Sequence, residues 1–64
     1  MTNQEFQEIY ESLSEPTKST FRGMVRKECQ LNYQQFFYRC KGITKLNVLE
    51  VPIIEKIIKT LKIK

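Results

Sequence analysis

Apolar side chains recur at helical spacing along this 64-residue chain. In the segment TNQEFQEIYESL they lie at i, i+3, i+4 and i+7, which places them on one face of a helix. The same spacing returns around Phe21 and Val25, and again near the end of the chain in an aliphatic stripe: Ile53, Ile54, Ile57, Ile58 and Leu61. This repeated helical period predicts an all-α fold, and the short length predicts one compact domain, residues 1–64, with a thin core.

Capping and turn residues divide the chain into four expected helices. Thr2 or Asn3 can cap the first, Ser14 the second and Asn32 the third, which Gly42 then closes. Pro52 disfavours helix in the residue before it, so we expect the last helix to start there. The expected helices span about residues 3–13, 15–29, 33–41 and 52–62.

Two local features leave alternatives open. Gly23 weakens the second helix, and either a close approach of another backbone or simple tolerance explains it. Between the last two helices, the apolar residues could plug the core from a loop, or residues 46–51 could form a short strand: Ile43, Leu46, Val48 and Val51.

Composition argues against catalysis, because the chain contains no His and no Asp. Every acidic residue is a Glu in a segment that we interpret as a solvated helix face. Cys29 and Cys40 are too few for a disulfide framework or a zinc site, so we interpret them as reduced apolar residues. We expect no enzymatic activity, cofactor, metal or small-molecule substrate. With no signal peptide or membrane span expected either, a cytoplasmic location follows.

Charge is distributed unevenly along the chain. Residues 1–15 carry four Glu and no base, whereas residues 16–45 carry seven Lys or Arg against one Glu. A basic middle is typical of a surface that binds polyanions, since phosphate contacts supply most non-specific affinity for nucleic acid. Solubility alone would also favour such lysines and arginines.

The expected helix 33–41 has two contrasting faces. Phe36, Phe37, Cys40 and Tyr33 share one arc, which we assign to the core, and the opposite arc displays Gln34, Gln35, Tyr38 and Arg39. Gln can bond adenine and Arg can bond guanine, each through two hydrogen bonds in the major groove of DNA. The displayed residues are therefore candidates for reading bases. The flanking residues are candidates for phosphate contacts: Lys18, Arg22, Asn32, Lys41 and Lys45.

Residues 21–61 resemble the phage-repressor type of helix-turn-helix protein, known from bacteria and phages. The matching residues are Val25 and Cys29 facing inward, Leu31 in the turn, Asn32 as cap, Phe36 at the buried centre, and Gly42 after the second motif helix. The resemblance implies that this second helix enters the major groove of double-stranded DNA. It also implies that Tyr33, Gln34 and Tyr38 touch bases, and that the protein is a small transcriptional regulator.

Two residues depart from that family's pattern. Gln30 stands where the turn usually has a left-handed Gly, so it carries a steric penalty unless the turn is wider. Arg26 stands where a small inward residue is usual, so it would hold the helices apart or extend outward.

Other functions remain compatible with the sequence. The aliphatic face of helix 52–62 could serve a protein–protein interaction or a homodimer, and a homodimer would also fit DNA binding. Residues 53–64 could instead form a basic amphipathic helix on a membrane surface, but the domain needs that apolar stripe for its own core.

Overall fold

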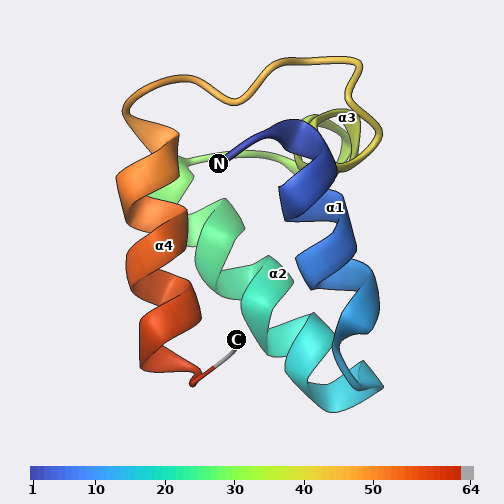
Figure 1. Cartoon of the computed structure of the whole chain (residues 1–64), viewed down its shortest axis with the longest axis vertical. Coiled ribbons are helices and arrows are strands. Elements are labelled where there is room, and N and C mark those ends of the chain that lie inside the picture. The colour runs from blue at the N-terminus through green and yellow to red at the C-terminus, as the bar shows by residue number, and fades with distance from the viewer. Residues whose placement is uncertain (63–64) are drawn as a thin grey trace.

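A computed structural model describes residues 1–62 of the chain, and these residues form four helices and no strand. The helices are α1 (Asn3–Ser12), α2 (Glu15–Cys29), α3 (Tyr33–Cys40) and α4 (Glu50–Thr60). The expected all-α class is confirmed. Figure 1 shows α1, α2 and α4 side on and α3 end on, with the 41–49 connection arching over one end of the molecule.

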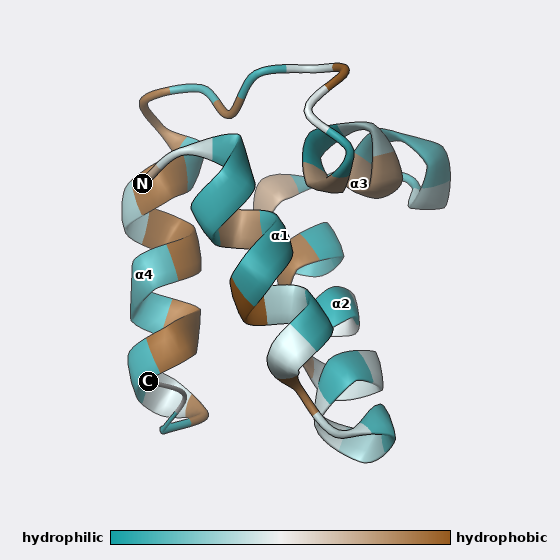
Figure 2. Cartoon of the chain, turned by 45° about the vertical axis from the view of Figure 1, so that its right-hand side comes forward, coloured by the Kyte–Doolittle hydropathy of each residue, from teal (hydrophilic) through white to brown (hydrophobic). Residues whose placement is uncertain are grey.

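The helices are arranged around α2, which packs against each of the other three, while α1 also packs against α3. Aromatic and aliphatic side chains from all four helices meet between them, and the innermost are fully buried: Phe6, Phe21, Val25, Phe36 and Ile54. The apolar segments of α4 turn toward the other helices in Figure 2. Burial of these stripes is the main source of helix stability, because isolated helices this short are marginal in water.

The helix starts follow local capping, with one exception. Thr2 caps α1 in a capping box with Glu5, since the Thr2 Oγ1 accepts from the Glu5 N–H at 3.1 Å and the Glu5 carboxylate accepts from the Thr2 N–H at 2.8 Å. Ser14 occupies the N-cap position of α2, as expected, but the expected capping by its hydroxyl is wrong. The Ser14 hydroxyl makes no cap bond and instead donates to the Thr17 hydroxyl at 3.1 Å.

The start of α4 differs from the expected position at residue 52. The Asn47 Oδ1 accepts from the backbone N–H groups of Leu49 and Glu50, at 2.8 and 2.9 Å, and so lets the helix begin at Glu50. Pro52 then lies within the first turn, where its missing N–H leaves no helical bond unmade.

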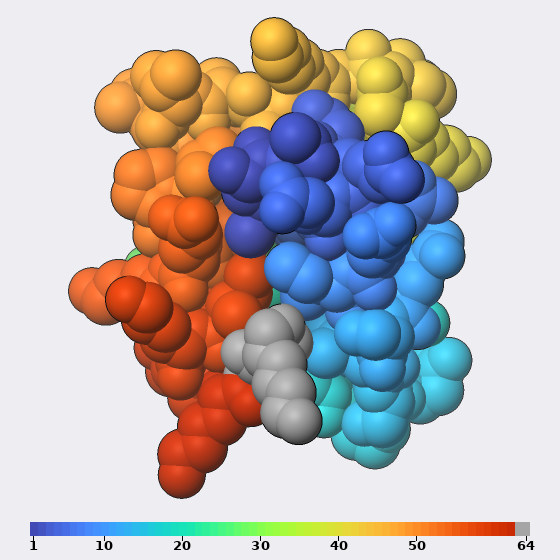
Figure 3. Space-filling model, viewed as in Figure 1, coloured from blue at the N-terminus to red at the C-terminus, as the bar shows by residue number. Residues whose placement is uncertain are grey.

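The 41–49 connection is held by a residue far away in sequence. The Asn3 side chain donates to the carbonyl oxygens of Arg39 and Thr44, at 2.9 and 2.8 Å, and accepts from the Leu46 N–H at 3.2 Å. Leu46 is thereby inserted into the core, whereas Ile43 and Val48 stay exposed, and the alternative of a strand at 46–51 is wrong. In Figure 3 this connection covers the end of the molecule above α1 and α4.

Candidate nucleic-acid interface

A three-residue connection joins α2 to α3. Gln30 adopts the left-handed conformation, with φ 56° and ψ 48°, and the Leu31 N–H donates to the Arg26 carbonyl at 2.9 Å. Leu31 packs partly buried against the core. Asn32 then starts α3 through a capping box with Gln35. The connection is therefore as tight as the one expected from the sequence, with Gln30 bearing the steric cost that Gly would avoid.

The apolar and polar faces of α3 are separated as expected, except at Tyr33 and Arg39. Phe36 and Cys40 are buried, and Phe37 is partly buried against the core. Gln34 and Tyr38 lie on the exposed side, where the Gln34 Nε2 donates to the Tyr38 hydroxyl at 2.6 Å. This bond fixes the orientation of the amide and leaves its carbonyl oxygen and second N–H facing solvent.

Arg39 is not displayed with them. Its Nε donates to the Glu50 carboxylate at 2.9 Å, its Nη1 donates to the Gln35 carbonyl at 3.1 Å, and the side chain is only 13% exposed. Gln35 is exposed, but its Oε1 accepts from the Asn32 N–H at 2.9 Å. The interpretation of Arg39 as a base-reading residue is therefore revised, since its side chain ties α3 to α4.

Glu50 contradicts the expectation that every glutamate lies on a solvated helix face. Its side chain is 8% exposed, and besides Arg39 it also accepts from the Asn47 N–H at 3.2 Å. The sequence contains no local signal for this burial, because Glu50 pairs with a residue eleven positions away across the connection.

Tyr33 occupies a position between the two faces of α3. Its side chain is 52% exposed, so its assignment to the core arc is wrong, although its ring lies 4.7 Å from that of Phe37. The guanidinium carbons of Arg22 and Arg26 each lie 5.5 Å from the centre of the Tyr33 ring, within the range of cation–π attraction.

A row of cations follows α2 on this side of the molecule: Lys18, Arg22 and Arg26, spaced one helical turn apart. The Lys18 Nζ lies 5.4 Å from the centre of the Tyr10 ring, and the Arg22 Nη1 donates to the Tyr10 hydroxyl at 2.9 Å. That hydrogen bond raises the pKa of the Arg22 guanidinium, which therefore stays charged. Within residues 1–62, none of the three cations has a carboxylate oxygen within 4.0 Å.

Arg26 is the member of this row that the sequence analysis missed. Of the two expected alternatives, in which Arg26 holds the helices apart or extends outward, the structure has the second, with the guanidinium over the Tyr33 ring. Its i, i+4, i+8 spacing from Lys18 and Arg22 was a signal that could have revealed the row.

The remaining phosphate candidates surround α3. Asn32 is exposed at its N-terminus, where its Oδ1 is used for capping by accepting from the Gln35 N–H at 2.7 Å. Lys41 is exposed at the C-terminal end of α3, directly before Gly42, which has φ 77°. Lys45 is exposed in the 41–49 connection.

The two thiols are poor candidates for chemistry. Cys29 and Cys40 are both free, and burial raises the pKa of each, that of Cys40 to about 11. Reactive cysteines have lowered pKa values, so neither thiol is activated as a nucleophile. In the described part of the chain, no group of three or more Cys or Glu side chains is placed to hold a metal ion.

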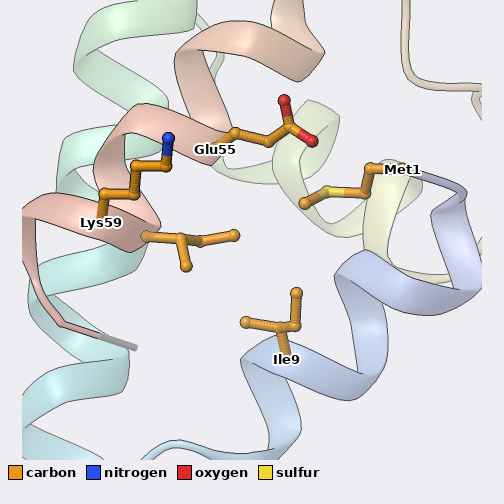
Figure 4. A pocket seen from close by; sticks show the side chains of 5 residues that line it. Met1, Ile9, Glu55 and Lys59 are labelled. Carbon is orange, nitrogen blue, oxygen red and sulfur yellow. The ribbon is translucent and has the colours of Figure 1, made fainter. Parts of the chain in front are cut away.

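A hollow of about 340 Å³ opens between α1 and α4, away from α3. Figure 4 shows its apolar side chains, which include Met1 and Ile9, with Glu55 and Lys59 of α4 at its edge. Among the described residues, none of the expected site residues line it.

The aliphatic face of α4 is largely used by the protein's own core. Ile54 and Ile57 are buried, and Ile53, Ile58 and Leu61 pack partly buried against the core. Among residues 1–62, the large aliphatic side chains that are exposed to solvent belong instead to the 41–49 connection: Ile43 at 66%, Val48 at 84% and Leu49 at 74% exposure.

Comparison of the chain with models of protein families, with curated proteins and with solved structures finds no significant match. Among residues 1–62, none of the helices combines the length and apolar character needed to cross a bilayer.

Proposed function

We propose that this chain binds double-stranded DNA in a sequence-specific manner, as a small helix-turn-helix regulator of transcription acting in a bacterial or phage cytoplasm. One observation carries the proposal. On the outward side of α3, the Gln34 amide lies beside the Tyr38 phenol. The first residue of the same helix, Tyr33, contacts Arg22 and Arg26 of α2, which have no carboxylate partner among residues 1–62. Groups suited to bases and groups suited to phosphates thus share one surface.

Gln34 is the strongest candidate for reading a base. An amide can accept from adenine N6 and donate to N7 at once, and a well-made pair of this kind discriminates by about 1–3 kcal/mol. Tyr38 uses its hydroxyl to hold that amide and presents its ring beside it. Because Arg39 is paired with Glu50, α3 no longer offers the guanidinium that would favour guanine. We therefore expect α3 to prefer A·T over G·C base pairs.

The phosphate contacts would come from residues around α3. Lys18 and Arg22 extend from α2, Asn32 lies at the start of α3, and Lys41 and Lys45 lie beyond its end. These side chains have N–H groups to donate, and four of them are cationic. Such contacts fix the register of a protein on the duplex without reading sequence.

The test is selection of bound sequences from random duplex DNA at two salt concentrations, followed by anisotropy titrations of the enriched site. We expect an A·T-containing motif and an affinity whose logarithm falls linearly with log salt, by about 0.9 for each phosphate contacted. Gln34→Ala should lower discrimination by about 1–3 kcal/mol, whereas Arg22→Ala should weaken all sequences alike. Lys56→Ala also removes one positive charge, from an exposed position on α4, and serves as the control. Binding without an enriched motif would contradict sequence-specific recognition.

A second candidate is a protein–protein interaction module, favoured by the exposed apolar side chains of the 41–49 connection. The aliphatic face of α4, where the sequence placed this alternative, has its central side chains in the core. An apolar interface would persist at high salt, whereas DNA binding by several phosphate contacts would weaken steeply. Sedimentation of the protein at two salt concentrations, with Val48→Ser as the variant, separates the two functions.

A further inference from the structure

Two arginines of α2 share one aromatic ring of α3. The guanidinium carbons of Arg22 and Arg26 both lie 5.5 Å from the centre of the Tyr33 ring, and that ring packs on Phe37 at 4.7 Å between centres. Phe37 in turn lies 5.6 Å from the fully buried Phe36. The ring beside the two cations is therefore anchored to the core.

This arrangement places two positive charges beside one aromatic ring. Across residues 1–62 neither guanidinium has a carboxylate within 4.0 Å, and Glu15 acts on Arg22 only at longer range. The Nε of Arg26 is buried and has no hydrogen-bond partner in the part of the chain that the structure describes. Buried polar groups are normally paired, so an unpartnered guanidinium N–H calls for an explanation.

We propose that Arg22, Arg26 and Tyr33 form a phosphate-binding site, in which the two guanidinium groups bind one phosphate and Tyr33 positions them. The inference rests on the proposed function in taking the phosphodiester group of duplex DNA as the natural ligand. It assigns Arg26 a binding role that the sequence did not suggest, and it changes Tyr33 from a base-reading residue to a positioning residue.

The chemistry of the three side chains suits a phosphate group. Guanidinium is planar, stacks on aromatic rings and donates two parallel bonds to phosphate oxygens. Arg22 keeps most of its N–H donors available, because within residues 1–62 its only hydrogen bond to another side chain is the one to Tyr10. Tyr33 is also the first residue of α3, so the positive end of the helix dipole adds to the attraction of an anion.

The first experiment needs no DNA. Inorganic phosphate is titrated into the full chain at constant ionic strength, maintained with chloride, while the Tyr33 ring and arginine side-chain NMR signals are followed. We expect saturable shifts of these signals in the wild type and in Lys56→Ala, and loss of saturation in Arg22→Ala and Arg26→Ala. Arg26→Lys keeps the charge without the planar fork and should bind phosphate more weakly than the wild type.

The second experiment measures binding to random-sequence duplex between 50 and 200 mM salt. Each phosphate contact contributes about 0.9 to the slope of log affinity against log salt, or about a 3-fold loss over this range. Arg26→Ala should lower that slope by about this amount. Tyr33→Ala should weaken binding to all sequences by one common factor, and Tyr33→Phe should restore it, because the ring rather than the hydroxyl holds the guanidiniums.

The outcomes separate this inference from the proposed function. Loss of base preference in Tyr33→Ala with unchanged non-specific affinity would overturn the site and leave DNA binding intact. If Arg22→Ala and Arg26→Ala both kept the salt slope of the wild type, the site would likewise be overturned and DNA binding would remain. Saturable phosphate binding that requires both arginines, in a protein that fails to bind duplex DNA, would support the site and refute the proposed function. Absence of both activities would refute both.

Discussion

The ion pair between Arg39 and Glu50 should dominate the stability of the junction between α3 and α4. Both side chains are nearly buried, at 13% and 8% exposure, and the Nε–Oε1 distance is 2.9 Å. Removing one partner of a buried pair leaves an uncompensated charge and costs about 3–5 kcal/mol. We therefore expect Arg39→Met and Glu50→Met each to lower the free energy of unfolding by about that amount.

The double variant Arg39→Met/Glu50→Met should be more stable than the sum of the single changes implies. The double variant buries no lone charge. Its main loss of stability arises because the Asn47 N–H no longer has the Glu50 oxygen as acceptor, which costs about 1–3 kcal/mol. The expected coupling energy is at least about 2 kcal/mol. A domain of this size is stable by only about 3–10 kcal/mol, so urea unfolding should be followed at low temperature.

Glu50→Gln provides a milder variant if the methionine changes prevent folding, since it removes the charge and keeps an oxygen acceptor. We expect it to cost less than Glu50→Met, with unchanged base preference in DNA binding. A structural role for the ion pair would be excluded if Arg39→Met reduced stability by less than about 1 kcal/mol while altering base preference. Arg39 would then be a reader of DNA.

Three further predictions concern the helices and the core. Gly23→Ala should stabilise the protein by up to about 1 kcal/mol in urea unfolding, because an added Cβ meets no atom within 4 Å and glycine weakens a helix interior. Phe36→Ala should cost about 3–5 kcal/mol, since the side chain is fully buried and its ring centre lies 5.2 Å from that of Tyr10 and 5.6 Å from that of Phe6. Cys40, with a pKa of about 11 against a usual 9.0, should be alkylated slowly at pH 8 until the protein unfolds. Because the native thiol keeps its proton where the unfolded thiol loses it, Cys40 should also make stability fall as pH rises from about 9 to 11.

Each of these has an outcome that would count against it. No gain from Gly23→Ala would mean that helix propensity at this position does not limit the stability of α2. For Phe36, the smaller change to Leu should cost only about 1–2 kcal/mol, and an equal loss in both variants would argue against a cavity as the cause. Rapid alkylation of native Cys40, compared with a Cys40→Ala control, would show that the thiol is exposed by local opening.

Much of the fold could be predicted because its signals are local. The periodic apolar stripes predict four helices, and α2 begins and ends where expected, at Glu15 and Cys29. Asn32 caps the start of α3, and Gly42 follows its end with a left-handed backbone. Both signals depend only on neighbouring residues. The one displaced start, that of α4, comes from the side chain of Asn47, which outweighs the bias of Pro52 against a helical residue before it.

The candidate site was only partly predictable, because its decisive contacts join segments that are distant in sequence. Periodicity placed Arg39 among the exposed residues of α3, but the packing of α4 brings Glu50 against it and withdraws it from solvent. In the same way, Arg26 and Tyr33 are brought together by the angle at which α2 meets α3. By itself the sequence determined which residues form helices and which helix face is apolar, since both follow from bonding and spacing within a turn or two. Only the tertiary structure decided which polar side chains are paired and which remain available, because charge pairing depends on distances between helices.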